Sequence, residues 1–220
     1  MKMRMMIKHA KESLSVCLPN TRISANDCPM DAAEKPASLT VEEYLAGEQP
    51  SEVRHEYLGG AVYAMAGASD EHNAISLNLA SALRSHLRGK TCRVFMADAK
   101  VRLTVANDDI FYYPDVMVAC DSRDTDRFFK RFPKVLVEVL SETTERTDRR
   151  EKFLSYTQIE TLEEYVLVAQ DKREVTLYRR ADQWRPELLN KPDQRLQLTS
   201  LDFALPLSGI YEGLTNRLRQ

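Results

Sequence analysis

Residues 133–141 read PKVLVEVLS, an apolar run with a single carboxylate, Glu138, inside it. The length of the run and its β-branched residues predict a buried β-strand. Successive side chains of a strand point to opposite faces, so each residue can be assigned to a face. One face carries Val135, Val137 and Val139, and the other carries Leu136, Glu138 and Leu140. Glu138 therefore points in the same direction as two leucines.

A carboxylate in this position needs a partner, because removing a charge from water is costly. The partner can be a buried Arg or Lys, a proton held by a raised pKa, or a bound cation. Glu138 could also reach solvent at the end of the strand. The strand by itself leaves the structural and the functional explanations open.

A second acid favours a functional explanation. Asp115 follows Pro114 at the start of another predicted strand, where the proline removes one ladder hydrogen bond. Two acids on neighbouring strands can share one Mg²⁺ or Mn²⁺ ion, since these cations prefer oxygen ligands and retain several waters. The alternative for Asp115 is an ordinary Pro-Asp turn.

Lys152 supplies the opposite charge. It lies in a predicted helix after the Glu138 strand, a helix that we expect Asp148 to cap. By the three-and-four spacing rule, Arg149 and Tyr156 share the face of Lys152. Lys152 could orient an attacking water or neutralise charge that develops on a phosphate. A solvated helix lysine is the ordinary alternative, so the hypothesis depends on the combination.

The other patterns predict one α/β (α+β) domain over residues 37–220. Helices are expected from Thr40 to about Gly47 and over residues 70–88, the first because Thr40 and Glu43 form a capping box. Turn residues predict hairpins at Gly59–Gly60 and at residues 171–173. Strand-like segments over residues 92–105 and 110–120 are expected to be adjacent in one sheet, and a last strand and a closing helix are expected after Trp184.

Composition limits the partners and the compartment. The formal charge of −2, from 31 Lys and Arg against 33 Asp and Glu, gives no overall electrostatic signature of nucleic-acid binding. No run of about 18 apolar residues is present, which argues against a transmembrane helix. The four cysteines have no metal-ligand spacing, so we expect reduced thiols in a cytoplasmic protein. These cysteines are Cys17, Cys28, Cys92 and Cys120.

The first 36 residues differ from the rest. They begin with a basic segment and contain only short, interrupted apolar stretches without a clear cleavage site, which makes a poor signal peptide. Met30 precedes the first regular helix signal. We expect residues 1–36 to be an extension that is disordered or that results from an over-called start codon.

Five segments together resemble the Uma-type family of putative restriction endonucleases, a branch of the PD-(D/E)XK nuclease superfamily. They read SEVRHEYLGGAVYAMAGASDEHN, CRVFMADAKVRL, YYPDVMVACD, PKVLVEVLSETTERTDRREKFLSY and LEEYVLVAQDKREVTLYRR, and the resemblance covers residues 38 to 215. It implies a restriction-endonuclease-like fold with a mixed central sheet flanked by helices, and metal-binding acids on adjacent strands.

Carried over by position, Asp115 matches the Asp of the PD motif, and Glu138 matches the (D/E) position. The superfamily lysine is absent, since Leu140 stands there, and the resemblance assigns its role to Lys152 on the next helix. Glu56 matches an additional metal or water ligand. His72 also recurs in the pattern and could lie at the rim of the site, with Arg149 and Tyr156, or only pack in the core.

The resemblance implies a Mg²⁺-dependent or Mn²⁺-dependent endonuclease that hydrolyses DNA phosphodiester bonds. A homodimer would suit duplex cleavage, which needs two sites or two turns at one site. In this hypothesis Asp115, Glu138 and Glu56 bind the metal, and Lys152 assists the attack. The alternative is a non-catalytic nucleic-acid-binding or mobile-element-associated module on a nuclease fold. A basic groove near the acids would favour DNA. Its expected residues are Arg84, Arg88, Lys100, Arg102, Arg149, Arg150 and Lys152.

Overall fold

The computed structural model describes residues 38–141 and 145–214, so the expected N-terminal extension lies outside the described residues. The helical elements are α1 (Val41–Glu48), α2 (Asp70–His86), α3 (Glu145–Thr147), η1 (Asp148–Lys152), α4 (Phe153–Tyr156), η2 (Arg180–Asp182), η3 (Thr199–Leu201) and α5 (Leu207–Ile210). The strands are β1 (His55–Leu58), β2 (Ala61–Ala64), β3 (Arg93–Met96), β4 (Lys100–Val105), β5 (Asp108–Tyr112), β6 (Val116–Ala119), β7 (Phe129–Lys130), β8 (Pro133–Leu140), β9 (Glu164–Ala169), β10 (Val175–Arg179), β11 (Pro186–Leu189), β12 (Arg195–Leu198) and β13 (Phe203–Pro206).

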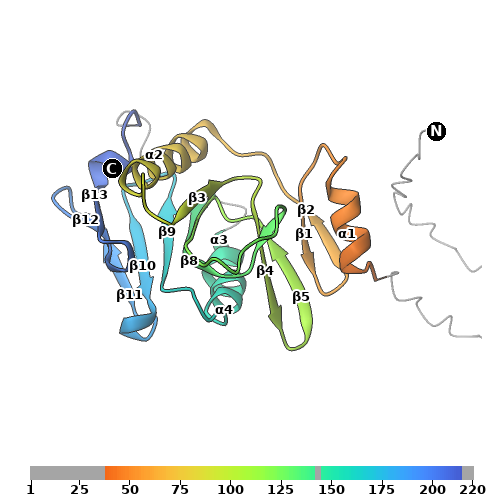
Figure 1. Cartoon of the computed structure of the whole chain (residues 1–220). Coiled ribbons are helices and arrows are strands. Elements are labelled where there is room, and N and C mark those ends of the chain that lie inside the picture. Colours follow the sequence, from red (N-terminus) through yellow and green to blue (C-terminus); the bar gives the residue numbers. More distant parts are fainter. Residues whose placement is uncertain (1–37, 142–144, 215–220) are drawn as a thin grey trace, which may run out of the picture. The chain divides into compact units, whose positions relative to one another are not determined.

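Two mixed sheets form the framework of the described residues (Figure 1). The five-stranded sheet has the order β2-β1-β5-β4-β7, and the six-stranded sheet has the order β11-β10-β9-β8-β6-β3. Each sheet contains one parallel pair, β4 with β7 and β8 with β9, among antiparallel neighbours. The strands expected to be adjacent in one sheet are therefore divided between the two sheets. Strands β4 and β5 pair in the five-stranded sheet, and β3 and β6 pair in the six-stranded sheet. The expected α+β class of mixed sheets with flanking helices is confirmed.

Strand β8 is buried on both faces, as its sequence predicts. Its valines join the α2 residues Ile75, Leu79 and Leu83 in one core cluster. Leu136 and Leu140 join a second cluster that contains Tyr156 of α4. Helices α2 and α4 therefore cover opposite faces of the six-stranded sheet, and Glu138 lies on the α4 side.

Local signals placed the other elements well. Thr40 accepts a hydrogen bond from the Glu43 amide, and Glu43 accepts one from the Thr40 amide, which completes the capping box of α1. The β1–β2 hairpin turns at Gly59 and Gly60, both with positive φ, a backbone conformation that glycine adopts without strain. None of the described helices is long and apolar enough to span a membrane.

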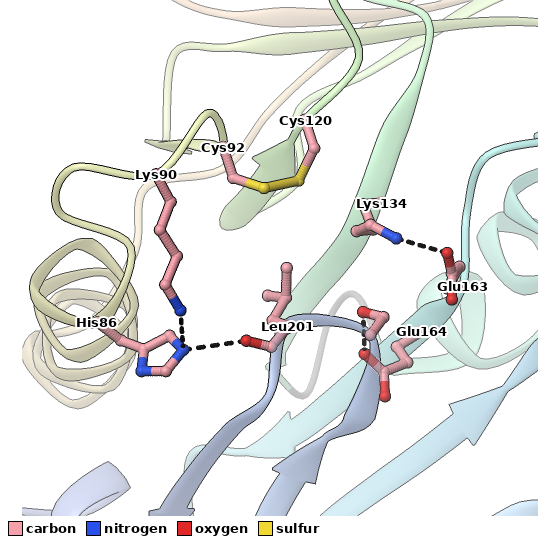
Figure 2. Close-up of a disulfide and its surroundings, with 9 residues drawn as sticks. His86, Lys90, Cys92, Cys120, Lys134, Glu163, Glu164 and Leu201 are labelled. Atoms are coloured by element: carbon pink, nitrogen blue, oxygen red, sulfur yellow. Dashed lines mark hydrogen bonds and ion pairs between the residues drawn. A yellow bond between two sulfur atoms is a disulfide. The ribbon is translucent and has the colours of Figure 1, made fainter.

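The cysteine expectation is wrong for two of the four residues. A disulfide joins Cys92 to Cys120 (Figure 2). Arg93 pairs with Ala119 in the antiparallel β3–β6 ladder, so the flanking cysteines lie side by side across the two strands. A search for short cysteine spacings could not reveal this pair, because the pairing of the two strands brings the cysteines together. Cys17 and Cys28 lie outside the described residues.

Candidate active site

The strand register brings Asp115 and Glu138 together. Val116 of β6 pairs with Val137 of β8, so one further step of the antiparallel register sets Asp115 opposite Glu138 on one face. Asp115 Oδ2 accepts a 2.7 Å hydrogen bond from the Val139 amide, and Asp115 Oδ1 lies 2.7 Å from His72 Nε2. His72, on the first turn of α2, thus contacts the predicted site instead of only packing in the core.

Lys152 lies among three carboxylates, and we call these four residues the carboxylate cluster. Lys152 Nζ lies 2.9 Å from Glu56 Oε1, 3.4 Å from Glu138 Oε1 and 3.2 Å from Asp148 Oδ1. Glu56 comes from the five-stranded sheet, whereas Glu138 comes from the six-stranded one. The predicted lysine on the helix after β8 therefore does reach Glu138, and it joins residues of both sheets.

Asp148 is the member of the cluster that the sequence analysis missed. It does not cap a helix that starts there, because the helical segment begins at Glu145 and Asp148 opens the π-helical turn η1. Its side chain is buried and faces Lys152 four residues later. An Asp followed by Lys at that spacing is a favourable helical pair, and this signal could have found it.

Aromatic rings enclose the cluster on the α4 side. Tyr156 donates a 2.8 Å hydrogen bond to Glu138 Oε1, and the Lys152 ammonium lies 5.5 Å from the centre of the Tyr112 ring. Tyr156 packs edge-on against both Tyr112 and Tyr165. Burial raises the pKa of Tyr156 well above its ordinary value, an effect that the neighbouring Glu138 carboxylate reinforces. Tyr156 is therefore a hydrogen-bond donor at physiological pH.

Burial and charge act differently on the two central groups. Burial raises the pKa of Glu138 well above its ordinary value, although the Lys152 ammonium opposes this shift. Burial would lower the pKa of Lys152, but the carboxylates of Glu138, Asp148 and Glu56 together raise it well above its ordinary value. Lys152 thus stays protonated, and the cluster with Asp115 carries more negative charge than one ammonium balances.

A second buried glutamate shows what a purely structural acid looks like in this protein. Glu164 is 1% exposed on β9, next to β8. Its oxygens accept hydrogen bonds from the Thr199 amide, the Thr199 hydroxyl and the Ser200 hydroxyl. In Glu138, by contrast, the contacts with other described residues use only Oε1. Both oxygens of Glu164 are thus hydrogen-bonded, whereas the described residues contact Glu138 through one oxygen.

The remaining predicted cations do not converge on the acids. Arg149 forms ion pairs with Glu145 at 2.8 Å and Glu174 at 3.8 Å, and it contacts no member of the carboxylate cluster. Arg149 and Lys152 are three residues apart in and around the turn η1, but they share no ion-pair partner. Arg102 is paired with Asp109. Arg102 and Arg149 therefore do not contribute to the expected basic groove at the acids.

The donor atoms suit a hard cation, although the described residues hold no group of three or more His, Cys, Asp or Glu arranged around one metal position. Glu56 Oε1 and Asp148 Oδ1 are buried, and neither accepts a hydrogen bond of good geometry from a described residue. Carboxylate oxygens with unused acceptor capacity are the ligands that Mg²⁺ and Mn²⁺ prefer. Asp115 and Glu138 are the two acids that lie opposite each other across β6 and β8 in register.

A mixed-sheet α+β fold with acids on adjacent central strands defines the restriction-endonuclease-like class. A nuclease-class structure from Anabaena variabilis, described as a putative nuclease belonging to DUF820, shares this fold with a TM-score of 0.65. Its sequence is 21% identical, and the match covers 79% of this chain and 97% of the other.

The chain belongs to the Uma2 family, described as "Putative restriction endonuclease", whose sequence model matches residues 41–208. Two similar proteins come from Synechocystis sp. The uncharacterized protein slr1290 is 37% identical over 178 residues, which cover 80% of this chain and 93% of the relative. The uncharacterized protein sll1609 is 33% identical over 135 residues, which cover 60% of this chain and 75% of the relative.

Proposed function

We propose that this protein is a metal-dependent endonuclease that hydrolyses DNA phosphodiester bonds. The observation that carries the proposal is the opposition of Asp115, the residue before β6, and Glu138 of β8, beside a buried lysine that links three carboxylates. Membership of the Uma2 family supports the same reaction class. A catalytic role would account for this cluster of buried charges, because buried charges destabilise a protein unless they are balanced.

In this proposal, Asp115 and Glu138 hold one Mg²⁺ or Mn²⁺ ion, and Glu56 is a further ligand or a ligand of its water. The bound ion would stabilise negative charge on the phosphate and lower the pKa of a water molecule. Asp115 is fixed for this role, since the Val139 amide and His72 orient its two oxygens. Tyr156 likewise fixes Glu138 by a hydrogen bond to Oε1, which leaves Oε2 free for the ion.

Lys152 stabilises charge and does not act as a base. Its raised pKa keeps it protonated, so it cannot accept a proton from water at neutral pH. An ammonium held by carboxylates from both sheets is instead preorganised to face negative charge that develops on the phosphate. Glu56, which is only partly buried, is the acceptor best placed to orient the attacking water.

A cleavage assay tests the function directly. Purified protein is incubated with supercoiled plasmid, linear duplex and single-stranded DNA, with Mg²⁺, Mn²⁺ or EDTA. We expect metal-dependent cleavage that falls at least a hundredfold in Asp115→Asn and Glu138→Gln, and that persists in Glu164→Gln, which alters a buried acid away from the site. Lack of wild-type cleavage with either metal would leave DNA binding without catalysis as the function. Light scattering of the same samples would show whether the active species is a homodimer.

A further inference from the structure

A basic pocket lies on the side of the five-stranded sheet that faces α1. It has a volume of about 550 Å³. Five segments form its wall: the end of α1, Arg54 before β1, residues 95–100 from β3 to the start of β4, Tyr113 after β5, and residues 127–130. The side chains used below are Arg54, Lys100, Tyr113, Arg127, Phe128 and Lys130.

Lys100 is the unusual residue of this pocket. It is only 7% exposed, and its Nζ lies 5.0 Å from the centre of the Tyr113 ring. No other described residue forms a hydrogen bond or an ion pair with this ammonium group. Burial lowers the pKa of Lys100. The Lys100 side chain lines the pocket, and no described carboxylate lies within ion-pair distance of its ammonium, so this group is available to an anion that binds there.

The acids of the pocket are already occupied. Glu48 accepts a 2.6 Å hydrogen bond from the Tyr113 hydroxyl and lies 2.8 Å from His55 Nδ1. Asp98 is paired with Arg54 at 3.0 Å. Lys130 donates only to the backbone carbonyls of Asp124 and Asp126 among the described residues. Three cations therefore face the pocket without a carboxylate partner within ion-pair distance in the described part of the chain: Lys100, Arg127 and Lys130.

An aromatic surface lies beside these cations. Phe128 is 50% exposed and adjoins Arg127 at the mouth of the pocket, although apolar rings of this size are usually buried. The Lys130 ammonium lies 5.4 Å from the centre of the Phe95 ring. Cations that contact phosphates, together with exposed rings on which bases stack, are the features that bind single-stranded nucleic acid.

The pocket and the acids share the same chain segments. Tyr113 is two residues before Asp115, and Arg54 is two residues before Glu56, separations that an extended chain spans in about 7 Å. Ala97, in the pocket connection, donates a 3.2 Å hydrogen bond to the carbonyl of Asp115. The pocket and Glu56 therefore lie at the same end of the five-stranded sheet, on its two faces.

We propose that the basic pocket binds one nucleotide of the DNA strand that is positioned at Asp115 and Glu138. The phosphate pairs with Lys100 and Arg127, and the base stacks on Phe128. This inference rests on the proposed function for its choice of ligand. It adds a binding subsite outside the carboxylate cluster and predicts a preference for DNA with an unpaired end or segment, because a base inside a duplex cannot enter a pocket.

Fluorescence anisotropy in EDTA separates this subsite from catalysis. The probe is a fluorescein-labelled oligothymidylate, compared with a blunt duplex of the same length. We expect Phe128→Leu to weaken oligothymidylate binding about tenfold and Phe128→Trp to preserve it, since the ring supplies the stacking. Leu188→Ala removes a similarly exposed apolar side chain on β11 and should have no effect.

Salt dependence tests the charge contacts. Lys100→Met and Arg127→Ala should each reduce the slope of log affinity against log salt by about 0.7, the value for one lost phosphate contact on a single strand. Arg185→Ala is the matched control, because Arg185 is also exposed and its side chain contacts no described residue through a hydrogen bond or an ion pair. Inorganic phosphate at matched ionic strength should not displace the oligonucleotide.

Three results would overturn the subsite: no oligothymidylate binding by the wild type, equal losses in the pocket variants and the controls, or full displacement by inorganic phosphate. Phe128→Leu changes an exposed residue, so the test does not depend on whether Lys100→Met folds. If the wild type cleaves DNA but the pocket variants bind normally, only the subsite fails. If the pocket variants lose binding and the wild type never cleaves, only the nuclease proposal fails.

Discussion

At the scale of single residues, Glu138 and Glu164 form a natural comparison. Both are buried glutamates on adjacent parallel strands, and they differ in the partners of their oxygens. Glu164 has three hydrogen bonds from backbone and hydroxyl donors. Glu138 shares one ammonium with two other acids. The first arrangement stabilises the fold, whereas the second retains negative charge that a cation can bind.

Replacing each glutamate by glutamine should separate these roles. At pH 4.5, Glu138→Gln should leave the melting temperature without metal almost unchanged, because Lys152 keeps two carboxylate partners. It should abolish the stabilisation by Mn²⁺, which for the wild type is expected to reach about 2.7 kcal/mol at a hundredfold excess over Kd. Thermal unfolding in EDTA and in Mn²⁺ measures both quantities.

Glu164→Gln is the control for that experiment. It should lower stability by about 1–3 kcal/mol through the loss of satisfied hydrogen bonds, and it should keep the full Mn²⁺ shift. An equal Mn²⁺ shift in Glu138→Gln and the wild type would show that Glu138 is not a ligand.

The raised pKa of Glu138 also predicts a dependence on pH. A carboxyl group with a raised pKa in the folded state stabilises the fold below its ordinary pKa of 4.5, and this stability is lost as the pH rises through the folded value. Without metal, the wild type should therefore lose stability relative to Glu138→Gln as the pH rises from 4.5 toward neutrality. Urea unfolding of both proteins across this range tests the sign, and parallel curves would contradict it.

At the scale of elements, the sequence predicted what depends on neighbours along the chain. The alternation in residues 133–140 gave β8 and both of its faces, and Thr40 with Glu43 gave the start of α1. It did not give the division into two sheets, since pairing between distant strands leaves no local pattern. Asp148 was expected to cap a helix, although its spacing of four residues from Lys152 is a local signal of the ion pair, whereas the Cys92–Cys120 disulfide depends on the β3–β6 register.

The disulfide makes a prediction at this scale. It closes a loop of 28 residues in sequence separation, and such a cross-link restricts the unfolded chain. The double variant Cys92→Ser/Cys120→Ser should lose about 3 kcal/mol of unfolding free energy relative to the oxidised wild type. Urea denaturation measures the loss, and dithiothreitol should lower the unfolding free energy of the wild type but not that of the double variant. Thiol titration of the denatured protein before and after reduction should differ by two groups, and no difference would contradict the pairing.

At the scale of the whole described domain, the carboxylate cluster lies where the two sheets meet. Glu56 belongs to the five-stranded sheet, Glu138 to the six-stranded one, and Asp148 and Lys152 to the helical turn between β8 and β9. The second core cluster also draws on both sheets, with Val101 and Tyr112 from one and Leu136 and Tyr165 from the other. Polar and apolar contacts thus join the same two layers.

Lys152→Met should accordingly weaken the domain as well as the reaction. Removing one partner of a buried ion pair costs about 3–5 kcal/mol, and here three carboxylates would lose their shared cation. Hydrogen exchange should accelerate in β1 and β8 together. Lys134→Met, which breaks an ion pair with the partly exposed Glu163, should leave both strands protected. Unchanged exchange in Lys152→Met would show that the apolar contacts alone join the sheets.

Lys152 therefore links the two sheets through its ion pairs with Glu56 and Glu138. Because the same ion pairs join the sheets and position the acids, the packing of the sheets and the geometry of the carboxylate cluster cannot change independently. Substitutions that loosen the contact between the sheets would therefore also change the distances within the carboxylate cluster. A metal ion between Asp115 and Glu138 would instead link β8 to the residue before β6, and would thus stabilise the pairing of two strands within the six-stranded sheet.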